Sequence, residues 1–199
     1  HEARDFLKEN VPALGALGYS PLACMEMSGY TAKVKAYFAL FENRSGGDLA
    51  MLTAFYMDMN GQVQFRSAYT EFITRFADER SVTTNNTNEL SVTPSIPGRE
   101  KYTFTRLRDA GRLQAAHGAL VQRAGDGPRK PLPAPGAVSA MLLEAISKEH
   151  HAHAAAGYFW MDVSAQAYRP TWKGACLMTW QLCWPVKNLL VSNRDRRPR

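Results

Sequence analysis

The sequence predicts an α+β fold in which an antiparallel β-meander of four to five strands carries helices packed on one face. Two observations lead to this prediction. Between residues 30 and 88, apolar and polar residues alternate in four consecutive runs with a turn signal between each pair, which is typical of antiparallel strands. Before and after this region, apolar residues recur at helical spacing. A closed small barrel is the alternative architecture for the same strands.

The strands of the meander follow one another through short connections. They are predicted over residues 31–42, 49–58, 62–76 and 80–87, and two shorter strands over residues 21–27 and 101–107 could flank them. Asn60 and Gly61 form a dipeptide that supports the two positive φ angles of a type I′ hairpin. The second and third strands of the meander are therefore expected to pair directly.

The third strand of the meander changes the parity of its apolar residues. Val63, Phe65 and Tyr69 fall on odd positions, whereas Phe72, Thr74 and Phe76 fall on even positions. Because side chains alternate between the two faces of a strand, one extra residue is needed to keep both sets on the same face. A bulge or bend is therefore predicted near residues 68–71.

Helices are predicted both before and after the meander. They span residues 2–17, 110–124 and 137–156. Pro12 lies inside the first and predicts a kink or two short pieces, because proline has no N–H to donate. Asp109 is a suitable N-cap for the second helix, and Gly157 is suited to end the third. A stretch rich in proline and glycine, residues 125–136, is predicted as the linker between the last two helices.

The C-terminal segment, residues 169–199, is predicted to follow an α+β domain of residues 1–168. Its apolar run is too short to cross about 30 Å of hydrocarbon, yet it holds three of the chain's four tryptophans. Because tryptophan prefers the interface between bilayer and water, a helix at a membrane interface or against a partner subunit is expected. An ordinary core helix is the alternative. The residues predicted at this interface are Trp172, Lys173, Trp180, Trp184, Lys187, Arg194, Arg196, Arg197 and Arg199.

The net charge of +6 is unevenly distributed along the chain. The last six residues hold four arginines and one aspartate, so half of the excess lies in this tail. Such a tail suits an anionic membrane surface or an acidic partner, whereas nucleic acid would require a basic face with interleaved aromatic side chains. The three cysteines contain no CxxC pair, which argues against a disulfide framework or a zinc knuckle and favours a reducing compartment.

One C-terminal stretch resembles a known group of proteins. The run from Tyr168 to Ala175, followed by residues 177–180, resembles the C-terminal end of a group of uncharacterised bacterial membrane-associated proteins with a YxPTWKGA-type segment. Residues 76–85, and Leu113 with His117, are similar to the same group. The resemblance implies hydrophobic segments before a soluble α+β domain and therefore a membrane address. It implies no chemistry.

A histidine-rich helix end is the candidate metal site. Glu149 and His153 are four residues apart on the third helix, and His150 and His153 are three apart, so either pair could supply two ligands on one face. A third ligand would come from His117, the remaining internal histidine. The alternatives are a solvated helix end for the cluster and a core histidine for His117, which lies on the apolar stripe of its helix.

A polar patch at the end of the fourth predicted strand is the candidate ligand site. Thr83, Thr84, Asn85 and Asn86 would line such a site with hydroxyl and amide groups. The alternative is an edge strand that passes into a turn, because Asn and Thr readily form local turn hydrogen bonds.

These features predict a non-catalytic module on the cytoplasmic side of a membrane-associated protein, acting as an accessory subunit or an interaction module of a membrane complex. The expected partners are a membrane surface or membrane-protein subunits, and neither nucleic acid nor a cofactor is expected. The chain begins at His1 rather than methionine, so a transmembrane anchor upstream is possible. A metal-dependent enzyme built on the histidine cluster and a small-ligand-binding domain are the alternatives.

Overall fold

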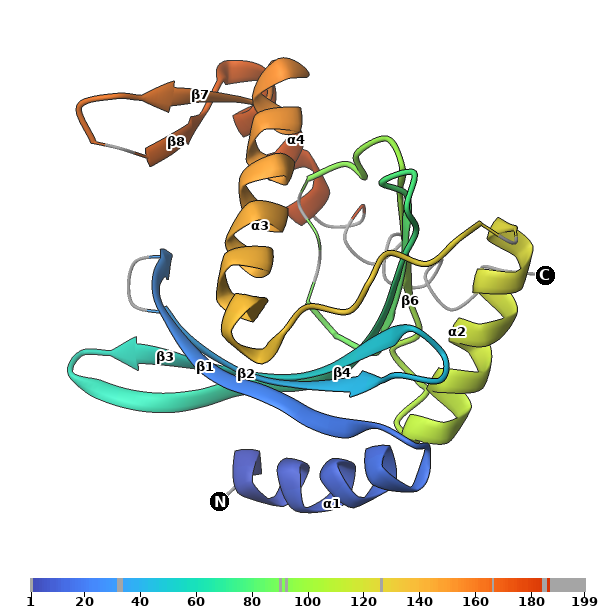
Figure 1. The fold of residues 1–199 in the computed structure, drawn as a ribbon. Helices are drawn as coiled ribbons and strands as arrows, with labels where there is room; N and C mark the ends of the chain where they lie inside the picture. The colour runs from blue at the N-terminus through green and yellow to red at the C-terminus, as the bar shows by residue number, and fades with distance from the viewer. Residues whose placement is uncertain are drawn as a thin grey trace. The chain divides into compact units, whose positions relative to one another are not determined.

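The computed structural model describes residues 2–31, 34–89, 91, 93–125, 127–165, 167–183 and 186. The chain forms two compact units, whose elements are drawn in Figure 1. Unit 1 comprises His1–Asn88 and Gly98–Pro135, and unit 2 comprises Glu89–Pro97 and Gly136–Arg199. The third predicted helix and the tryptophan-rich C-terminal segment thus belong to the same unit.

Unit 1 is a six-stranded, mostly antiparallel sheet with two helices. Its elements are α1 (Glu2–Ala16), β1 (Ser20–Thr31), β2 (Val34–Asn43), β3 (Asp48–Met59), β4 (Gln62–Arg75), β5 (Ser81–Asn85), β6 (Arg99–Thr103) and α2 (Ala110–Ala124). Strands β1 to β5 pair antiparallel in chain order, and β6 pairs parallel to β5. The α+β class and the antiparallel sheet are confirmed, and both flanking segments add strands to the meander.

The sheet is open. In the described part of the chain β1 and β6 are its two edges, so the alternative of a closed barrel is wrong. Strand β6 runs parallel to β5 because the chain returns to the start of β5 before β6 begins, with Ser81 opposite Arg99 and Asn85 opposite Thr103. No local feature of the β6 sequence could have predicted that direction.

The hairpin between β3 and β4 has the predicted turn. Asn60 and Gly61 have φ angles of 57° and 84°, as a type I′ turn requires. The amide of Gly61 donates to Oδ1 of Asp58 over 2.7 Å, which stabilises the turn further. The Asn60–Gly61 prediction is therefore confirmed.

A bulge in β4 explains the change of parity, but it lies before the predicted stretch. Phe55 pairs with Ser67, whereas the next residue, Tyr56, pairs with Phe65, so Arg66 is the extra residue. Odd positions before Arg66 and even positions after it therefore share one face. The predicted bend at residues 68–71 was misplaced because Tyr69 has the same odd parity as Val63 and Phe65, although it follows the bulge and lies on the opposite face.

Helices α1 and α2 pack on one face of the sheet, which we call the first face. Two buried apolar clusters fill this contact: Leu14, Tyr19, Phe41, Ala50, Leu52, Phe72 and Leu113 form one, and Phe76, Val82, Leu120 and Val121 form the other. Burial of each large apolar side chain contributes about 1.5–3 kcal/mol. Helix α1 continues through Pro12 as one element, with the proline exposed, so the prediction of two short pieces is wrong.

The other side of the sheet, which we call the second face, carries the alternate side chains of the same strands. Its buried residues include Ala36, Leu40, Leu49, Met51, Thr53, Glu71 and Asn85. Apolar residues from β2 and β3 thus lie beside polar residues from β3, β4 and β5.

Unit 2 contains two helices and a short hairpin. Its elements are α3 (Val138–Ala155), β7 (Phe159–Asp162), β8 (Ala167–Pro170) and α4 (Trp172–Leu182), preceded by a 3₁₀ turn, η1 (Pro135–Ala137), that begins in unit 1. Gly157, with a φ of 75°, follows α3 as predicted. Strands β7 and β8 pair antiparallel, and Arg169 lies 2.6 Å from Asp162 across the hairpin. This hairpin was not predicted from the sequence.

Candidate functional site

Unit 2 carries the predicted tryptophan interface. Trp172 and Trp180 on α4 are 85% and 64% exposed, and Trp160 on β7 is 49% exposed. Met161, Val163 and Leu182 are exposed as well. Large apolar side chains are normally buried, so these exposed side chains of unit 2, which we call together the tryptophan surface, are unusual for a protein that only meets water.

One side of α4 forms a continuous stripe within this surface. A shallow hollow of about 370 Å³ runs along it, lined by Trp172, Ala175, Cys176, Thr179, Trp180 and Cys183. These positions recur every three or four residues, which places them on one side of a helix. Small side chains lie between the two tryptophans along this stripe, and both rings are exposed.

The start of α4 is fixed to the end of α3. The hydroxyl of Thr171 accepts the amide of Gly174 over 3.1 Å, which caps the helix, and donates to the carbonyl of Gly157 over 2.7 Å. Lys173 donates to the carbonyl of Ala156 and lies 4.5 Å from the ring centre of Tyr158. Lys173, predicted at the interface, therefore binds to its own unit, and α4 is held at a defined angle by its first turn.

Part of the predicted interface lies outside the described residues. Trp184, Lys187, Arg194, Arg196, Arg197 and Arg199 all belong to this part of the chain. Conversely, Trp160 and Val163 belong to the observed surface but were not predicted, because the β7–β8 hairpin was not recognised. The aromatic run of residues 158–160 after Gly157 was the signal available, since aromatic residues favour strands.

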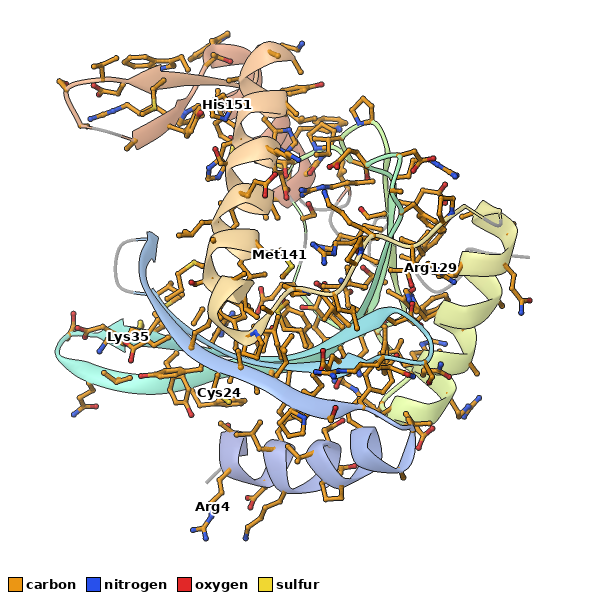
Figure 2. The ribbon with its side chains drawn as sticks, in the orientation of Figure 1. Arg4, Cys24, Lys35, Arg129, Met141 and His151 are labelled. Carbon is orange, nitrogen blue, oxygen red and sulfur yellow. The ribbon has the colours of Figure 1, made fainter. Side chains whose placement is uncertain are left out.

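The histidines of α3 pack against aromatic side chains of the hairpin. The ring centres of His150 and His151 lie 4.9 and 5.9 Å from that of Tyr168, and His153 lies 5.8 Å from Phe159; Figure 2 labels His151 on α3. Burial lowers the pKa of His150. The imidazoles thus join α3 to β7 and β8 through ring contacts, with His153 buried and His151 exposed.

The predicted metal ligands do not form a recognisable metal site. His153 is 3% exposed, and its Nε2 lies 3.7 Å from Oε1 of Glu149 without a hydrogen bond. Within residues that the structure describes, no group of three or more His, Cys, Asp or Glu side chains is placed to hold a metal ion. Both ring nitrogens of His117, the proposed third ligand, have hydrogen-bond partners in unit 1.

His117 is a core histidine in a chain of buried hydrogen bonds. Its Nε2 and Nδ1 lie 2.9 Å from the hydroxyls of Thr74 and Thr84, and Thr74 donates to Asp48 over 2.6 Å. Because Thr74 gives its one proton to Asp48, Nε2 must donate to Thr74, and Nδ1 of the neutral ring accepts from Thr84. Burial lowers the pKa of His117 to about 4, with a smaller effect from Arg129. The imidazole is therefore neutral and structural.

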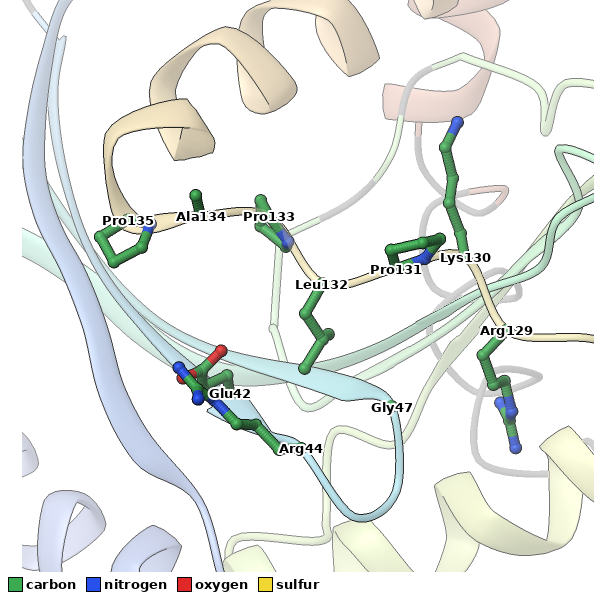
Figure 3. Close-up of a pocket in the computed structure, with 10 residues that line it drawn as sticks. All are labelled: Glu42, Arg44, Gly47, Arg129, Lys130, Pro131, Leu132, Pro133, Ala134 and Pro135. Carbon is green, nitrogen blue, oxygen red and sulfur yellow. The ribbon is translucent and has the colours of Figure 1, made fainter.

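A groove in unit 1 lies between the β2–β3 hairpin and the extended segment 129–135. It encloses about 520 Å³ and is lined by Glu42, Arg44, Gly47 and residues 129–135. Figure 3 shows Leu132 pointing from the segment toward the hairpin. Four of the seven residues from 129 to 135 are proline or alanine, so this side of the groove offers few hydrogen-bond donors.

The charges of this groove are internally paired. Each basic residue lies close to a carboxylate: Arg44 to Glu42 at 2.7 Å, Arg129 to Asp48 at 3.6 Å, and Lys130 to Glu79 at 2.6 Å. Arg129 also packs on the ring of Phe76. The three cations are balanced by three carboxylates, so the groove has no excess charge with which to attract an anionic ligand.

Side chains of the polar patch, residues 83–86, differ in their hydrogen bonding: some have partners within the fold, and one oxygen has none. Thr84 binds His117, and Asn86 binds the backbone of Thr70 and Leu107, so both complete the first face. Thr83 is half-buried. Asn85 is fully buried on the second face, where its Nδ2 donates to Oε2 of Glu71 over 2.9 Å and its Oδ1 has no partner.

Comparisons of the chain with protein-family models, with curated proteins and with solved structures found no match. Across the described residues, no helix combines the length and the apolar character needed to cross a membrane. The observations that bear on function are therefore the exposed tryptophans of unit 2 and the buried polar side chains of unit 1.

Proposed function

We propose that this protein is a non-catalytic module that attaches to an anionic membrane surface through the tryptophan surface of unit 2. The observation that carries the proposal is that all three described tryptophans, Trp160, Trp172 and Trp180, are exposed and belong to one unit. Tryptophan combines a large apolar ring with an N–H donor, and both are satisfied at the boundary between lipid headgroups and acyl chains.

The charge of this region is compatible with an anionic membrane surface. Residues 170–194 contain no aspartate or glutamate, and the single acidic residue of the hairpin, Asp162, is paired with Arg169. Nothing in this region therefore repels an anionic surface. Each arginine of the C-terminal tail adds about 1 kcal/mol of attraction when it lies near such a surface, and salt weakens that attraction.

The apolar and basic signals together set the strength of attachment. Full burial of a large apolar side chain is worth about 1.5–3 kcal/mol, so the tryptophans alone provide weak, reversible binding. Stable peripheral attachment commonly needs a second signal, and the basic tail supplies one. The position of the arginines close after the apolar run is the pattern retained on the cytoplasmic side, which we propose as the side of attachment.

Vesicle flotation with the full chain tests the proposal. Vesicles of phosphatidylcholine mixed with phosphatidylglycerol should carry the protein, and pure phosphatidylcholine should carry much less. The triple variant Trp160→Ala, Trp172→Ala and Trp180→Ala should bind at least about 100-fold more weakly, because three rings no longer enter the interface. High salt should weaken binding of the wild-type chain as well.

A matched control comes from unit 1, where Met59 and Val63 are 51% and 57% exposed. The double variant Met59→Ala and Val63→Ala removes smaller exposed apolar groups of unit 1 and should bind vesicles like the wild type. Equal loss in both variants would show that exposed apolar area of any kind drives binding. Vesicle binding that survives the triple variant, or a stable complex with a membrane protein in place of lipid binding, would overturn the proposal.

A further inference from the structure

The second face of unit 1 carries a buried polar set on three adjacent strands. Thr53 on β3 and Asn85 on β5 are fully buried, and Glu71 on β4 is 8% exposed. Glu71 is paired with Met51 on one side and with Asn85 on the other, and Thr53 is paired with Tyr69, two positions away along β4. Neighbouring strands lie about 4.8 Å apart, so these side chains form one group.

The set contains buried hydrogen-bonding groups without partners. Asn85 Oδ1 and Thr53 Oγ1 have none, nor has the hydroxyl of Ser67, which lies opposite Phe55 on the same face. Among the described residues Asn85 is the only group that binds Glu71, and no cation lies within ion-pair distance of that carboxylate. Buried polar groups normally have hydrogen-bond partners, so these three unpartnered atoms are suited to bind a ligand.

The open positions are complementary to a hydrogen-bond donor that carries positive charge. The carboxylate of Glu71 accepts the Asn85 amide through one oxygen, so the amide oxygen of Asn85 must be the free atom, and it can only accept. The second oxygen of Glu71 is also an acceptor, and the hydroxyl of Thr53 can act as one. Phe55 and Tyr69 lie beside the set with ring centres 6.1 Å apart, and aromatic faces attract cations.

We propose that this set binds the primary ammonium group of a small organic ligand, whose apolar body lies on the second face. An ammonium group offers three N–H donors to Glu71, Asn85 and Thr53, and the partly buried rings of Phe55 and Tyr69 supply apolar surface beside them. A divalent metal ion fits less well, because calcium takes six to eight oxygen ligands and the set contains one carboxylate. The inference concerns unit 1 and does not depend on membrane attachment.

Binding of hexylammonium to the full chain tests the inference, with hexanol as the neutral ligand of the same length. Calorimetry and amide chemical shifts should show hexylammonium binding that perturbs residues of β3, β4 and β5, and little binding of hexanol. Glu71→Gln keeps the shape of the side chain but removes its charge, so affinity should fall at least about tenfold. Thr53→Val removes one hydroxyl at constant volume and should weaken binding by a smaller factor.

Glu42→Gln is the matched control. Glu42 is 7% exposed on the same face, but it is paired with Arg44 at 2.7 Å, so its substitution should leave hexylammonium binding unchanged. The unliganded proteins provide a second readout: Glu71→Gln should raise the melting temperature, since it removes an unpaired buried charge, whereas Glu42→Gln should lower it. If Glu71 served only to stabilise the fold, Glu71→Gln would lower the melting temperature.

Three results would overturn the inference. The first is no hexylammonium binding at millimolar concentration by a folded wild-type chain. The second is equal binding by wild type and Glu71→Gln, or equal binding of hexanol. The third is calcium binding that displaces hexylammonium and is lost in Glu71→Gln, which would assign the same oxygens to a metal ion. If Glu71→Gln does not fold, Thr53→Val carries the same comparison.

Discussion

Gly174 lies so close to Tyr158 that a Cβ atom at position 174 would stand 2.0 Å from the Tyr158 carbonyl oxygen. The neighbour is backbone, which cannot rotate away as a flexible side chain could. This contact, together with the Thr171 cap, holds the first turn of α4 against Gly157 and Tyr158, shortly after the end of α3. The exposure of Trp172 and Trp180 therefore depends on a glycine that carries no functional group.

Gly174→Ala is expected to destabilise unit 2 by at least about 1–3 kcal/mol, the usual cost of overpacking a filled site. Faster hydrogen exchange in α4 and a lower denaturation midpoint would show it. The matched control is Gly118→Ala in α2, where a Cβ would meet nothing within 4 Å. That change should be neutral or stabilise by about 0.5–1 kcal/mol, because alanine favours helix. Equal effects at both positions would contradict the close contact.

Thr171→Ala is expected to cost about 1–2 kcal/mol, since it removes an N-cap acceptor and a buried donor with one substitution. Thr171→Ser keeps both roles and should restore most of the stability. Vesicle binding by the alanine variant should weaken as α4 frays, which links the cap to the proposed function. A serine variant as unstable as the alanine variant would show that the threonine methyl group, and not its hydroxyl, is required.

His117 is expected to make the stability of unit 1 depend on pH. Burial lowers its pKa to about 4 from 6.5, so its contribution is fully present above pH 6.5 and falls as the pH drops toward 4, because only the unfolded chain takes up the proton. The loss reaches about 3 kcal/mol. Urea denaturation at pH 7.5, 5.5 and 4.5 measures it, and His117→Gln should flatten the dependence.

His151→Gln is the control for that experiment, because His151 is exposed and should leave the profile of unit 1 unchanged. Asp48, whose pKa is raised by burial, changes stability in the opposite sense as the pH falls, but it is present in both proteins. If the stability of wild type and of His117→Gln fell equally steeply with pH, His117 would be excluded as the cause of the pH dependence.

Gly61→Ala should destabilise the β3–β4 hairpin by about 1–2 kcal/mol, because an L-residue is strained at its φ of 84°. Gly15→Ala in α1 is the control, since a Cβ there meets nothing and its φ lies in the helical range. Thermal denaturation of both variants gives the comparison. A Gly61→Ala chain as stable as Gly15→Ala would mean that the turn rearranges without cost.

Features of the fold that depend on neighbouring residues were predictable. The Asn60–Gly61 turn, the Asp109 cap and the ends of α2 follow from local backbone preferences, and the structure has each of them. The parallel direction of β6 depends on a return path of the chain, which no local pattern encodes. The β7–β8 hairpin escaped recognition because its strands are four residues long, too short for alternation to stand out.

The candidate sites also differ in how far the local sequence could reveal them. Trp172 and Trp180 could be identified because their spacing on one helix is a local property. The set of Thr53, Glu71 and Asn85 could not, because only the register of three strands brings these residues together. Asn85 was selected as part of a polar run, but its relevant neighbour is 14 positions away in the sequence.

The stripe of α4 also has a consequence for the protein in water. Trp172 and Trp180 form an exposed apolar strip, and residues 170–194 contain no aspartate or glutamate that would keep two copies apart. Without an acceptor surface, two such strips can cover each other, so the protein should associate with itself as its concentration rises. Salt should strengthen this association by screening the basic residues nearby, whereas it weakens attachment to anionic lipid. A higher ionic strength would thus shift the protein from attachment to lipid toward association with itself.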